Sequence, residues 1–395
     1  MTMDRRRFLK TAAVTATAVS VVELPGSARA ADLSQFVEGA GIPQRPLGRT
    51  GIEVPIMQLG TSQRLDPDYD KVLHRSFKNG VTWFDTALSY GRGASHRAIA
   101  NFVDQIGDRS KLWLTSKSGS GRVSGLDKAI DEALEELRTD YLDLYLMHGI
   151  NDVEMLEPEF LALGEKLKNA GKIRFFGFSC HDGNVVELMN KAARTGGIDA
   201  ILFRYNFRRY GDLELNRAID ACHRAGIGLL AMKTQGSVPR EIEAVVDFQS
   251  QDFTLGQAKL KSVWADQRIS SIVSEMDSVK YVRENIAAAR SEKPLTAEES
   301  HQLNQLAALT SGYACNGCNH LCESAVPVEA AIAAPLRYLM YYECYGKTER
   351  ARELYQAIPN EARNVPDELL QAACSVCPQG IDIPVRLADA RRLLA

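Results

Sequence analysis

The sequence lacks the features that mark several large classes of protein. Its 47 basic and 50 acidic residues leave a net charge of −3, without the strong positive charge of a nucleic-acid-binding protein. Beyond Ala31, no apolar run approaches the ~18 residues of a membrane-spanning helix. Aromatic residues make up 7% of the 395 residues and hydrophobic residues 45%, which is typical of a globular chain. We therefore expect no nucleic-acid partner and no stable membrane insertion of the mature chain.

The sequence also lacks a Gly-x-Gly-x-x-Gly loop after any of its strand candidates, which argues against an open, doubly wound dinucleotide-binding sheet. From Arg45 onward, short β-rich runs alternate with amphipathic stretches at steps of about 30 residues, the length of one βαβ unit. The runs end near Thr61, Asp85, Lys117, Met147, Ser179, Tyr205, Met232 and Ser274. Eight such units are best closed into a (β/α)8 TIM barrel, so we predict an α/β barrel.

The first thirty residues have the pattern of a cleavable export signal. Residues 5–7 are arginines, residues 11–22 form a short apolar run, and residues 28–30 read Ala-Arg-Ala. The Arg-Arg pair followed by Phe-Leu-Lys at 8–10 resembles the twin-arginine type. We predict that residues 1–30 are removed and that the folded chain reaches the periplasm or another extracytoplasmic space. The alternative is a basic, disordered N-terminus.

Ionisable side chains follow three consecutive strand candidates. Asp85 follows the apolar run 81–84, Lys117 follows 112–116, and His148 follows 142–147. Tyr90 comes five residues after Asp85 in a glycine-containing loop. The carboxyl ends of barrel strands form the mouth, where functional side chains gather. Each residue alone has a structural explanation, but three successive strands that deliver them to one rim predict a catalytic site.

These residue types suit carbonyl reduction. A Tyr hydroxyl has a pKa of ~10, and an adjacent ammonium group favours its ionised form. We expect Lys117 to lower the pKa of Tyr90 and Asp85 to hold Lys117 protonated. Tyr90 would then donate a proton to a carbonyl oxygen as a hydride reaches the carbon. A neutral His148 would hydrogen-bond the same oxygen.

Together with neighbouring segments, these residues resemble the aldo-keto reductase family over roughly residues 44–290. The matching segments are Arg45 to Gly51, Phe84 to Ala87 with Tyr90-Gly91, Thr115 to Lys117, Asp140 to Leu144 with His148, and Gly171 to Arg174 with Gly177 and Ser179. The resemblance implies a (β/α)8 barrel oxidoreductase that acts on a small carbonyl or alcohol substrate and binds NADPH in extended form. It places the catalytic tetrad on Asp85, Tyr90, Lys117 and His148.

The resemblance also implies a nicotinamide site, from which this sequence departs in several places. The cofactor-binding positions correspond to Ser179, Cys180, Met232, Lys233, Lys280 and Asn285. Cys180 stands where the family has Asn, Leu202 where it has Gln, and Met232 where many members have an aromatic residue. The Met232-Lys233 pair resembles the iron–sulfur-bearing branch of the family.

The positions that bind the 2′-phosphate of NADP in the family correspond to Glu275 and Tyr281. A carboxylate beside a phosphate is repulsive, and Lys280 and Arg283 are the nearby basic residues. NADP(H), NAD(H) and the absence of any nicotinamide cofactor therefore all stay open.

Six of the eight cysteines lie in the final quarter of the chain. Cys315, Cys318 and Cys322 are closely spaced, and Cys377 is followed by Pro, as in bacterial 4Fe–4S ligation. We predict that these four cysteines bind one 4Fe–4S cluster, with Cys374 as the alternative fourth ligand. A zinc site and disulfides formed after export are the competing interpretations.

The predicted organisation is a signal peptide (1–30), an aldo-keto reductase barrel (31–295) and a mostly helical, ferredoxin-like 4Fe–4S domain (296–395). The predicted function is carbonyl–alcohol oxidoreduction by an exported enzyme that uses a nicotinamide cofactor, with a redox partner for the cluster. The alternative is an electron-transfer or binding protein whose barrel has lost nicotinamide-dependent activity.

Overall fold

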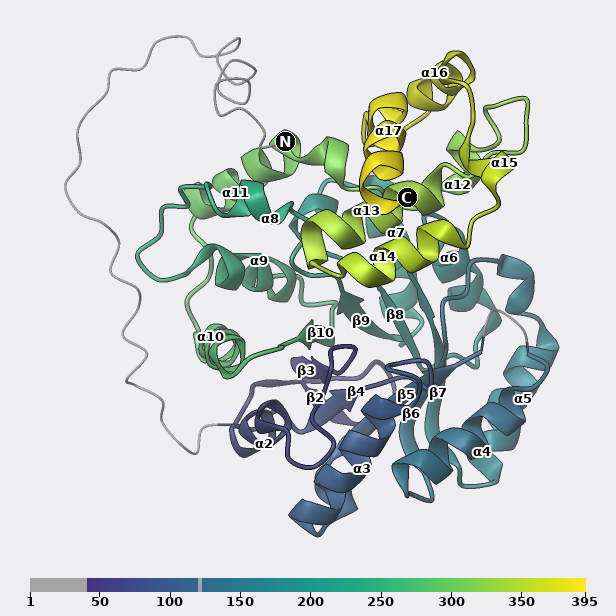
Figure 1. Ribbon diagram of the computed structural model, residues 1–395. Helices are drawn as coiled ribbons and strands as arrows, with labels where there is room; N and C mark the ends of the chain where they lie inside the picture. The colour runs from purple at the N-terminus through teal and green to yellow at the C-terminus, as the bar shows by residue number, and fades with distance from the viewer. Residues whose placement is uncertain (1–40, 120–122) are drawn as a thin grey trace.

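The computed structural model describes residues 41–119 and 123–395. The predicted signal peptide, residues 1–30, lies outside them. Eight parallel strands close a barrel in the order β10-β3-β4-β5-β6-β7-β8-β9, which confirms the predicted (β/α)8 architecture (Figure 1). The strands are β3 (Met57–Gly60), β4 (Trp83–Asp85), β5 (Trp113–Ser118), β6 (Leu142–Met147), β7 (Ile173–Cys180), β8 (Ala200–Arg204), β9 (Gly228–Met232) and β10 (Ser271–Glu275). Each ends within one residue of its predicted end.

Two hydrophobic layers follow from the alternation of side chains along the strands. One set fills the barrel interior and includes Trp83, Leu144, Leu202, Leu230 and Met232. The other set points outward and packs between the strands and the surrounding helices. A side chain two residues beyond an interior residue therefore also faces the interior, and at a strand's carboxyl end it reaches the mouth.

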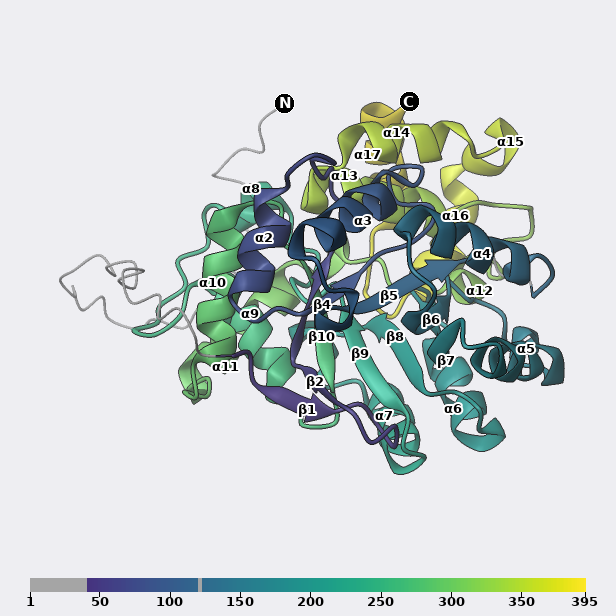
Figure 2. The same ribbon diagram turned by 90° about the horizontal axis from the view of Figure 1, so that it is seen from below.

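Helices surround the barrel (Figures 1 and 2). They are α2 (Lys71–Lys78), α3 (Ala94–Ile106), α4 (Leu126–Leu137), α5 (Pro158–Asn169), α6 (Val185–Thr195), α7 (Leu213–Arg224), α8 (Arg240–Glu243), α9 (Leu255–Trp264), α10 (Val279–Arg290) and α11 (Ala297–Leu309). Helix α4 buries Leu126, Ile130, Ala133 and Leu137, the apolar face expected from its 3.6-residue period. Capping boxes at Thr254 and Thr296 fix the starts of α9 and α11.

An antiparallel hairpin of β1 (Gln44–Pro46) and β2 (Glu53–Pro55) precedes the barrel. Leu47 and Val54 of this segment belong to the interior cluster, so the hairpin closes the amino-terminal end of the barrel. In Figure 2 the hairpin lies far from the C-terminal helices.

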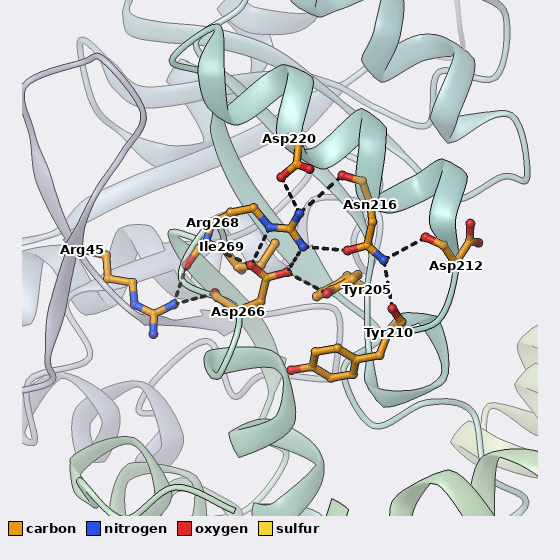
Figure 3. Close-up of polar contacts among 9 residues, drawn as sticks. All are labelled: Arg45, Tyr205, Tyr210, Asp212, Asn216, Asp220, Asp266, Arg268 and Ile269. Atoms are coloured by element: carbon orange, nitrogen blue, oxygen red, sulfur yellow. Dashed lines mark hydrogen bonds and ion pairs between the residues drawn. The ribbon is translucent and has the colours of Figure 1, made fainter.

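A polar network fastens this hairpin to the outer layer (Figure 3). The Arg45 guanidinium donates to the carbonyl oxygens of Asp266 and Ile269, in the connection between α9 and β10. The Asp266 carboxylate accepts hydrogen bonds from Tyr205 and Arg268, each at 2.7 Å. Arg268 also pairs with Asp220 of α7, so one arginine joins α7 to the loop that Arg45 holds.

The C-terminal helices lie over the carboxyl ends of the strands, next to β8 and β9 (Figure 1). They are α12 (Asn319–Cys322), α13 (Ala333–Tyr345), α14 (Thr348–Gln356), α15 (Asn360–Arg363), α16 (Asp367–Ser375) and α17 (Ile383–Leu394). Helix α11 packs instead on barrel-side residues, since Leu303 and Leu306 share a cluster with Phe207 and Phe253. In the described residues, no helix is long and apolar enough to cross a membrane.

Candidate active site

Asp85 and Lys117 form a buried ion pair at the barrel mouth. Strands β4 and β5 are neighbours with Asp85 opposite Thr115, and Lys117 lies two residues further along the same interior face. The Lys117 ammonium donates to Asp85 Oδ1 and to the carbonyl oxygen of Thr86, each at 2.6 Å. Side-chain exposure is only 2% for Lys117 and 3% for Asp85. Two consecutive strand ends thus deliver the predicted acid–ammonium pair.

Burial acts on both members of the pair. Desolvation raises the pKa of Asp85 and lowers the pKa of Lys117, and the attraction between the two groups opposes both shifts. Asp85 Oδ2 is buried and has no hydrogen-bond partner in the part of the chain that the structure describes. One carboxylate oxygen of Asp85 therefore accepts a hydrogen bond from Lys117, while the other accepts none from the described residues.

Tyr90 and His148 lie against the same ammonium group. Lys117 Nζ is 5.1 Å from the centroid of the Tyr90 ring, and that ring is 5.9 Å from the His148 ring in an edge-on arrangement. Burial, and to a smaller extent Lys117, lowers the pKa of His148 to about 3, so its imidazole is neutral near pH 7. The structure therefore brings the four predicted tetrad residues together.

The Tyr90 hydroxyl differs from the sequence-based expectation. Burial, followed by Asp85, Glu275 and Tyr341, raises the pKa of Tyr90 well above its ordinary value, whereas we expected Lys117 to lower it. The expected phenol–ammonium contact is also absent from the described residues, because the Lys117 hydrogen bonds go to Asp85 and Thr86. Tyr90 is therefore a protonated phenol at neutral pH, and its raised pKa makes it a weaker acid than the sequence led us to expect.

Two further residues of β7 and its following loop line this mouth. Ser179, a predicted cofactor residue, is buried, and its Oγ accepts a 2.9 Å hydrogen bond from the Gly149 backbone N–H. The His181 ring lies 6.3 Å from the His148 ring. Burial and the neighbouring cations Lys233 and Arg337 lower the pKa of His181. His181 is not among the residues predicted from the sequence, although the period-two alternation from Ser179 places it on the same face.

The other predicted cofactor residues are divided between the mouth and its surroundings. Met232 lies in the interior cluster, and Lys233 follows it in a positive-φ conformation at the mouth. Cys180 belongs to the outer hydrophobic layer, because it alternates with the interior Ser179. Asn285 donates to Ser274 Oγ at 2.9 Å, and Lys280 is exposed beside Glu284. The structure therefore does not bring Cys180, Asn285 and Lys280 to the tetrad.

The C-terminal region contacts the strand ends at which the sequence resemblance puts the cofactor. Lys233 Nζ lies 4.6 Å from the centroid of the Tyr345 ring and 5.7 Å from that of Tyr341. Glu275 pairs with Lys347 at 3.0 Å. Burial raises the pKa of Tyr341, but Arg337 and Lys233 outweigh it, and the net pKa is lowered. Helix α13 therefore adds its own polar groups to the mouth.

Comparison with known proteins identifies the barrel. The sequence model of the Aldo/keto reductase family matches residues 56–239. The barrel belongs to the aldo/keto reductase family. This chain is accordingly an oxidoreductase of that family type, and the predicted family resemblance of the barrel is confirmed.

Two relatives show how far the likeness extends. L-galactose dehydrogenase of Arabidopsis thaliana is 26% identical over 284 residues, which cover 62% of this chain and 88% of the relative. The (1S)-1,7-diacetoxy-luvungin A aldo-keto reductase of Citrus sinensis is 36% identical over 121 residues, 28% of this chain and 36% of the relative.

Solved structures agree with this assignment. A thermostable aldo-keto reductase is 27% identical with a TM-score of 0.54, and the match covers 67% of this chain and 100% of that one. An aldo-keto reductase of Klebsiella pneumoniae in complex with NADPH is 24% identical with a TM-score of 0.52, covering 64% of this chain and 91% of that one. The latter likeness shows the fold alone.

Beside the aldo/keto reductase barrel, the four cysteines predicted as cluster ligands line one cavity. Cys315, Cys318, Cys322 and Cys377 surround it, with Leu321, Leu336, Pro378 and Ile381 among the other lining residues. All eight cysteines are free thiols, so none is held in a disulfide. Burial raises the pKa of Cys322 to about 12, and the other three cysteines are among the groups that act on it. Three cysteines of one short segment and one from a distant part of the sequence thus line the same cavity.

The four cysteines are the residue type that binds a 4Fe–4S cluster, but the structure does not confirm the predicted cluster. In the described residues, no three His, Cys, Asp or Glu side chains are arranged to hold a metal ion. A zinc site requires its sulfurs within ~2.3 Å of one centre. A 4Fe–4S cluster takes four Cys thiolates, one for each iron, and therefore spaces them around a larger body. Cys374 and Cys377 both pack at the edge of the neighbouring hydrophobic cluster, and of these two only Cys377 is among the residues that line the cavity.

Proposed function

We propose that this chain is an exported oxidoreductase that interconverts a small carbonyl compound and its alcohol and carries one 4Fe–4S cluster. The observation that carries the catalytic part is the Lys117–Asp85 pair at 2.6 Å, with the Tyr90 ring against the same ammonium group. The NADPH complex of the Klebsiella pneumoniae aldo-keto reductase, which shares the fold, supports NADP(H) as the hydride donor, with NAD(H) as the alternative.

The chain's own groups hold the substrate oxygen and supply its proton. The Tyr90 phenol donates its proton to the carbonyl oxygen as that oxygen gains negative charge. His148, which is neutral, donates a hydrogen bond to the same oxygen. Lys117, held by Asp85 and the Thr86 carbonyl, places a positive charge beside the phenolate that remains. The bound nicotinamide supplies the hydride.

The remaining parts of the proposal rest on the sequence and on the cysteine cavity. The arginine pair at residues 5 and 6 supports export by the twin-arginine route to the periplasm. The shared cavity supports Cys315, Cys318, Cys322 and Cys377 as the cluster ligands. The cluster supplies one-electron transfer, and a redox partner would exchange those electrons.

Replacement of Tyr90 by Phe tests the catalytic proposal. We expect Tyr90→Phe to lower kcat by about 10²- to 10⁴-fold, because it removes only the proton donor. The assay follows NADPH and NADH oxidation with a panel of small aldehydes and ketones. Tyr69→Phe is the matched control, because Tyr69 is 55% exposed and stacks on His74 of α2. Equal rates for the wild type and Tyr90→Phe would reject the assignment.

A second candidate function is electron transfer or ligand binding by a barrel without nicotinamide chemistry. The contacts at the cofactor strand ends favour it, because Lys233 packs on Tyr345 and Glu275 pairs with Lys347. Both cofactor-side positions are thus engaged by the C-terminal region of the same chain.

Anaerobic titration with NADPH and NADH separates the two functions. Saturable binding of NADPH or NADH by the wild type supports the reductase. A reducible cluster with no binding at millimolar nicotinamide, in either the wild type or Lys347→Gln, supports the second function.

A further inference from the structure

Arg204 joins the barrel to the first cysteine of the cavity. It is the last residue of β8, opposite Met232 of β9, on the interior face of the strand. Its guanidinium donates to the Cys315 carbonyl oxygen at 2.6 Å and to Asn316 Oδ1 at 3.4 Å. Within the described part of the chain Arg204 makes no ion pair, so its charge faces only neutral acceptors.

The loop between β7 and α6 contacts the same cysteine segment from a second side. The Gly183 backbone N–H donates to the Gly317 carbonyl oxygen at 3.3 Å. A Cβ at Gly183 would lie 2.4 Å from Cys318 Cβ, so the loop after β7 touches the cysteine directly. Asp182 of that loop pairs with Arg337 of α13. The segment from Cys315 to Cys318 is therefore fixed by two adjacent strand ends of the barrel.

Cations and a hydrogen-bond donor lie next to this segment. The Gly317 backbone N–H donates to Cys315 Sγ at 3.4 Å, and the Arg204 guanidinium lies at the Cys315 carbonyl oxygen. The nearby Asp182 carboxylate is paired with Arg337. A cluster held by four thiolates is anionic, and its potential depends on net charge, on hydrogen bonds and on solvent exposure. A cation without a carboxylate partner is what a buried anionic group needs nearby.

We propose that Arg204 is a positioning residue for the 4Fe–4S cluster, which it serves from the barrel side by orienting the Cys315 segment and by stabilising the reduced, more negative cluster. The inference rests on the cluster part of the proposed function. In this proposal, residues of both the barrel and the C-terminal domain form the cluster site. Arg204 then links the mouth of the reductase site to the cysteine cavity through one side chain.

The test measures the reduction potential of the cluster in the full-length protein, purified without oxygen and titrated with dithionite under EPR. Arg204→Gln removes the charge but keeps hydrogen-bonding capacity, and Arg204→Lys keeps the charge. Lys347→Gln is the matched control, because Lys347 also joins the C-terminal region to the barrel as a cation but contacts Ser62 and Glu275.

We expect Arg204→Gln to shift the potential downward, because removal of a nearby positive charge disfavours reduction. Arg204→Lys should shift it less, and Lys347→Gln should leave it unchanged. The inference about Arg204 is overturned if Arg204→Gln has a full iron content and an unshifted potential. It is also overturned if Lys347→Gln shifts the potential by the same amount. In both cases the proposal of the cluster itself stands. A wild-type protein without iron overturns the cluster and the inference together.

Discussion

Lys117 carries its charge in a place where almost no water reaches it. Its carboxylate partner, Asp85, is buried as well. Loss of one member of a buried ion pair leaves the other uncompensated, at a cost of about 3–5 kcal/mol. The same residue therefore contributes to both stability and catalysis, and the two roles need separate measurements.

Lys117→Met should lower the thermal stability and abolish carbonyl reduction. Lys259→Met is its control, because Lys259 is fully buried and pairs with Glu243 at 2.7 Å outside the mouth. Glu243 is 38% exposed and stays hydrated, so the control should lose less stability and keep its turnover. Differential scanning calorimetry and steady-state kinetics on both variants check this. An active Lys117→Met protein would remove Lys117 from the mechanism.

For single residues, the sequence predicted where the side chains lie better than it predicted the directions of their pKa shifts. Strand ends place Asp85, Lys117 and His148 on one rim, because parallel strands share a carboxyl edge. The direction of the Tyr90 pKa shift could not be read in the same way, because burial outweighs every other influence on that hydroxyl and Tyr341 of a distant helix also acts on it. His181 could have been found by alternation from Ser179.

The loop between β7 and α6 is shaped to meet the cysteine segment. Gly183→Ala should displace that segment, because the new Cβ would meet backbone atoms of Cys318 as well as its side chain. We expect a lower iron content after anaerobic purification, with the four cysteines unchanged. Gly211→Ala is the control, since a Cβ there has no neighbour within 4 Å. Equal iron content in both variants would show that the loop accommodates the new Cβ without any effect on iron binding.

The network around Asp266 makes a second prediction for the outer layer (Figure 3). Burial raises the pKa of Asp266, but hydrogen bonds from Arg268 and Tyr205 outweigh it, and the net pKa is lowered. A depressed carboxyl pKa stabilises the fold above the unfolded value of ~3.9, and that stability is lost as the pH falls through the folded value.

Asp266→Asn should therefore unfold at a lower temperature than the wild type near pH 7. The difference should shrink below pH ~4 as the wild-type carboxylate is protonated. Thermal unfolding followed by circular dichroism at both pH values measures it. Asp104→Asn, at an ion pair in which Asp104 is 64% exposed, should show no comparable effect. A constant difference at both pH values would contradict the assignment.

For the whole molecule, the cysteine cavity is also part of a hydrophobic core. Cys315 and Cys322 share a cluster with Ile332, which precedes α13, and with Leu370 of α16 and Leu387 of α17. Removal of the proposed cluster should therefore loosen the C-terminal helices more than the barrel. Limited proteolysis after anaerobic chelation should cleave beyond residue 310 first. Simultaneous cleavage throughout the barrel would contradict this separation.

The placement of α13 over the mouth is the feature that the sequence could not predict. Its residues show a helical pattern, but nothing local indicates that Tyr341 and Tyr345 pack on Lys233, more than one hundred positions earlier. Such contacts depend on how the completed barrel presents its strand ends. The repeat of strand and helix, by contrast, follows from local periodicity. Right-handed connections between parallel strands then leave one way to close the barrel.

The position of α13 in the chain imposes an order on synthesis. A ribosome finishes all eight strands before it reaches residue 333, so the growing polypeptide first exposes an uncovered mouth. Any small molecule that the mouth encloses can enter during this interval, without the displacement of a helix. Cys377 emerges after the other three cysteines that line the cavity, so the cavity with four sulfurs is completed only after residue 377 has been added.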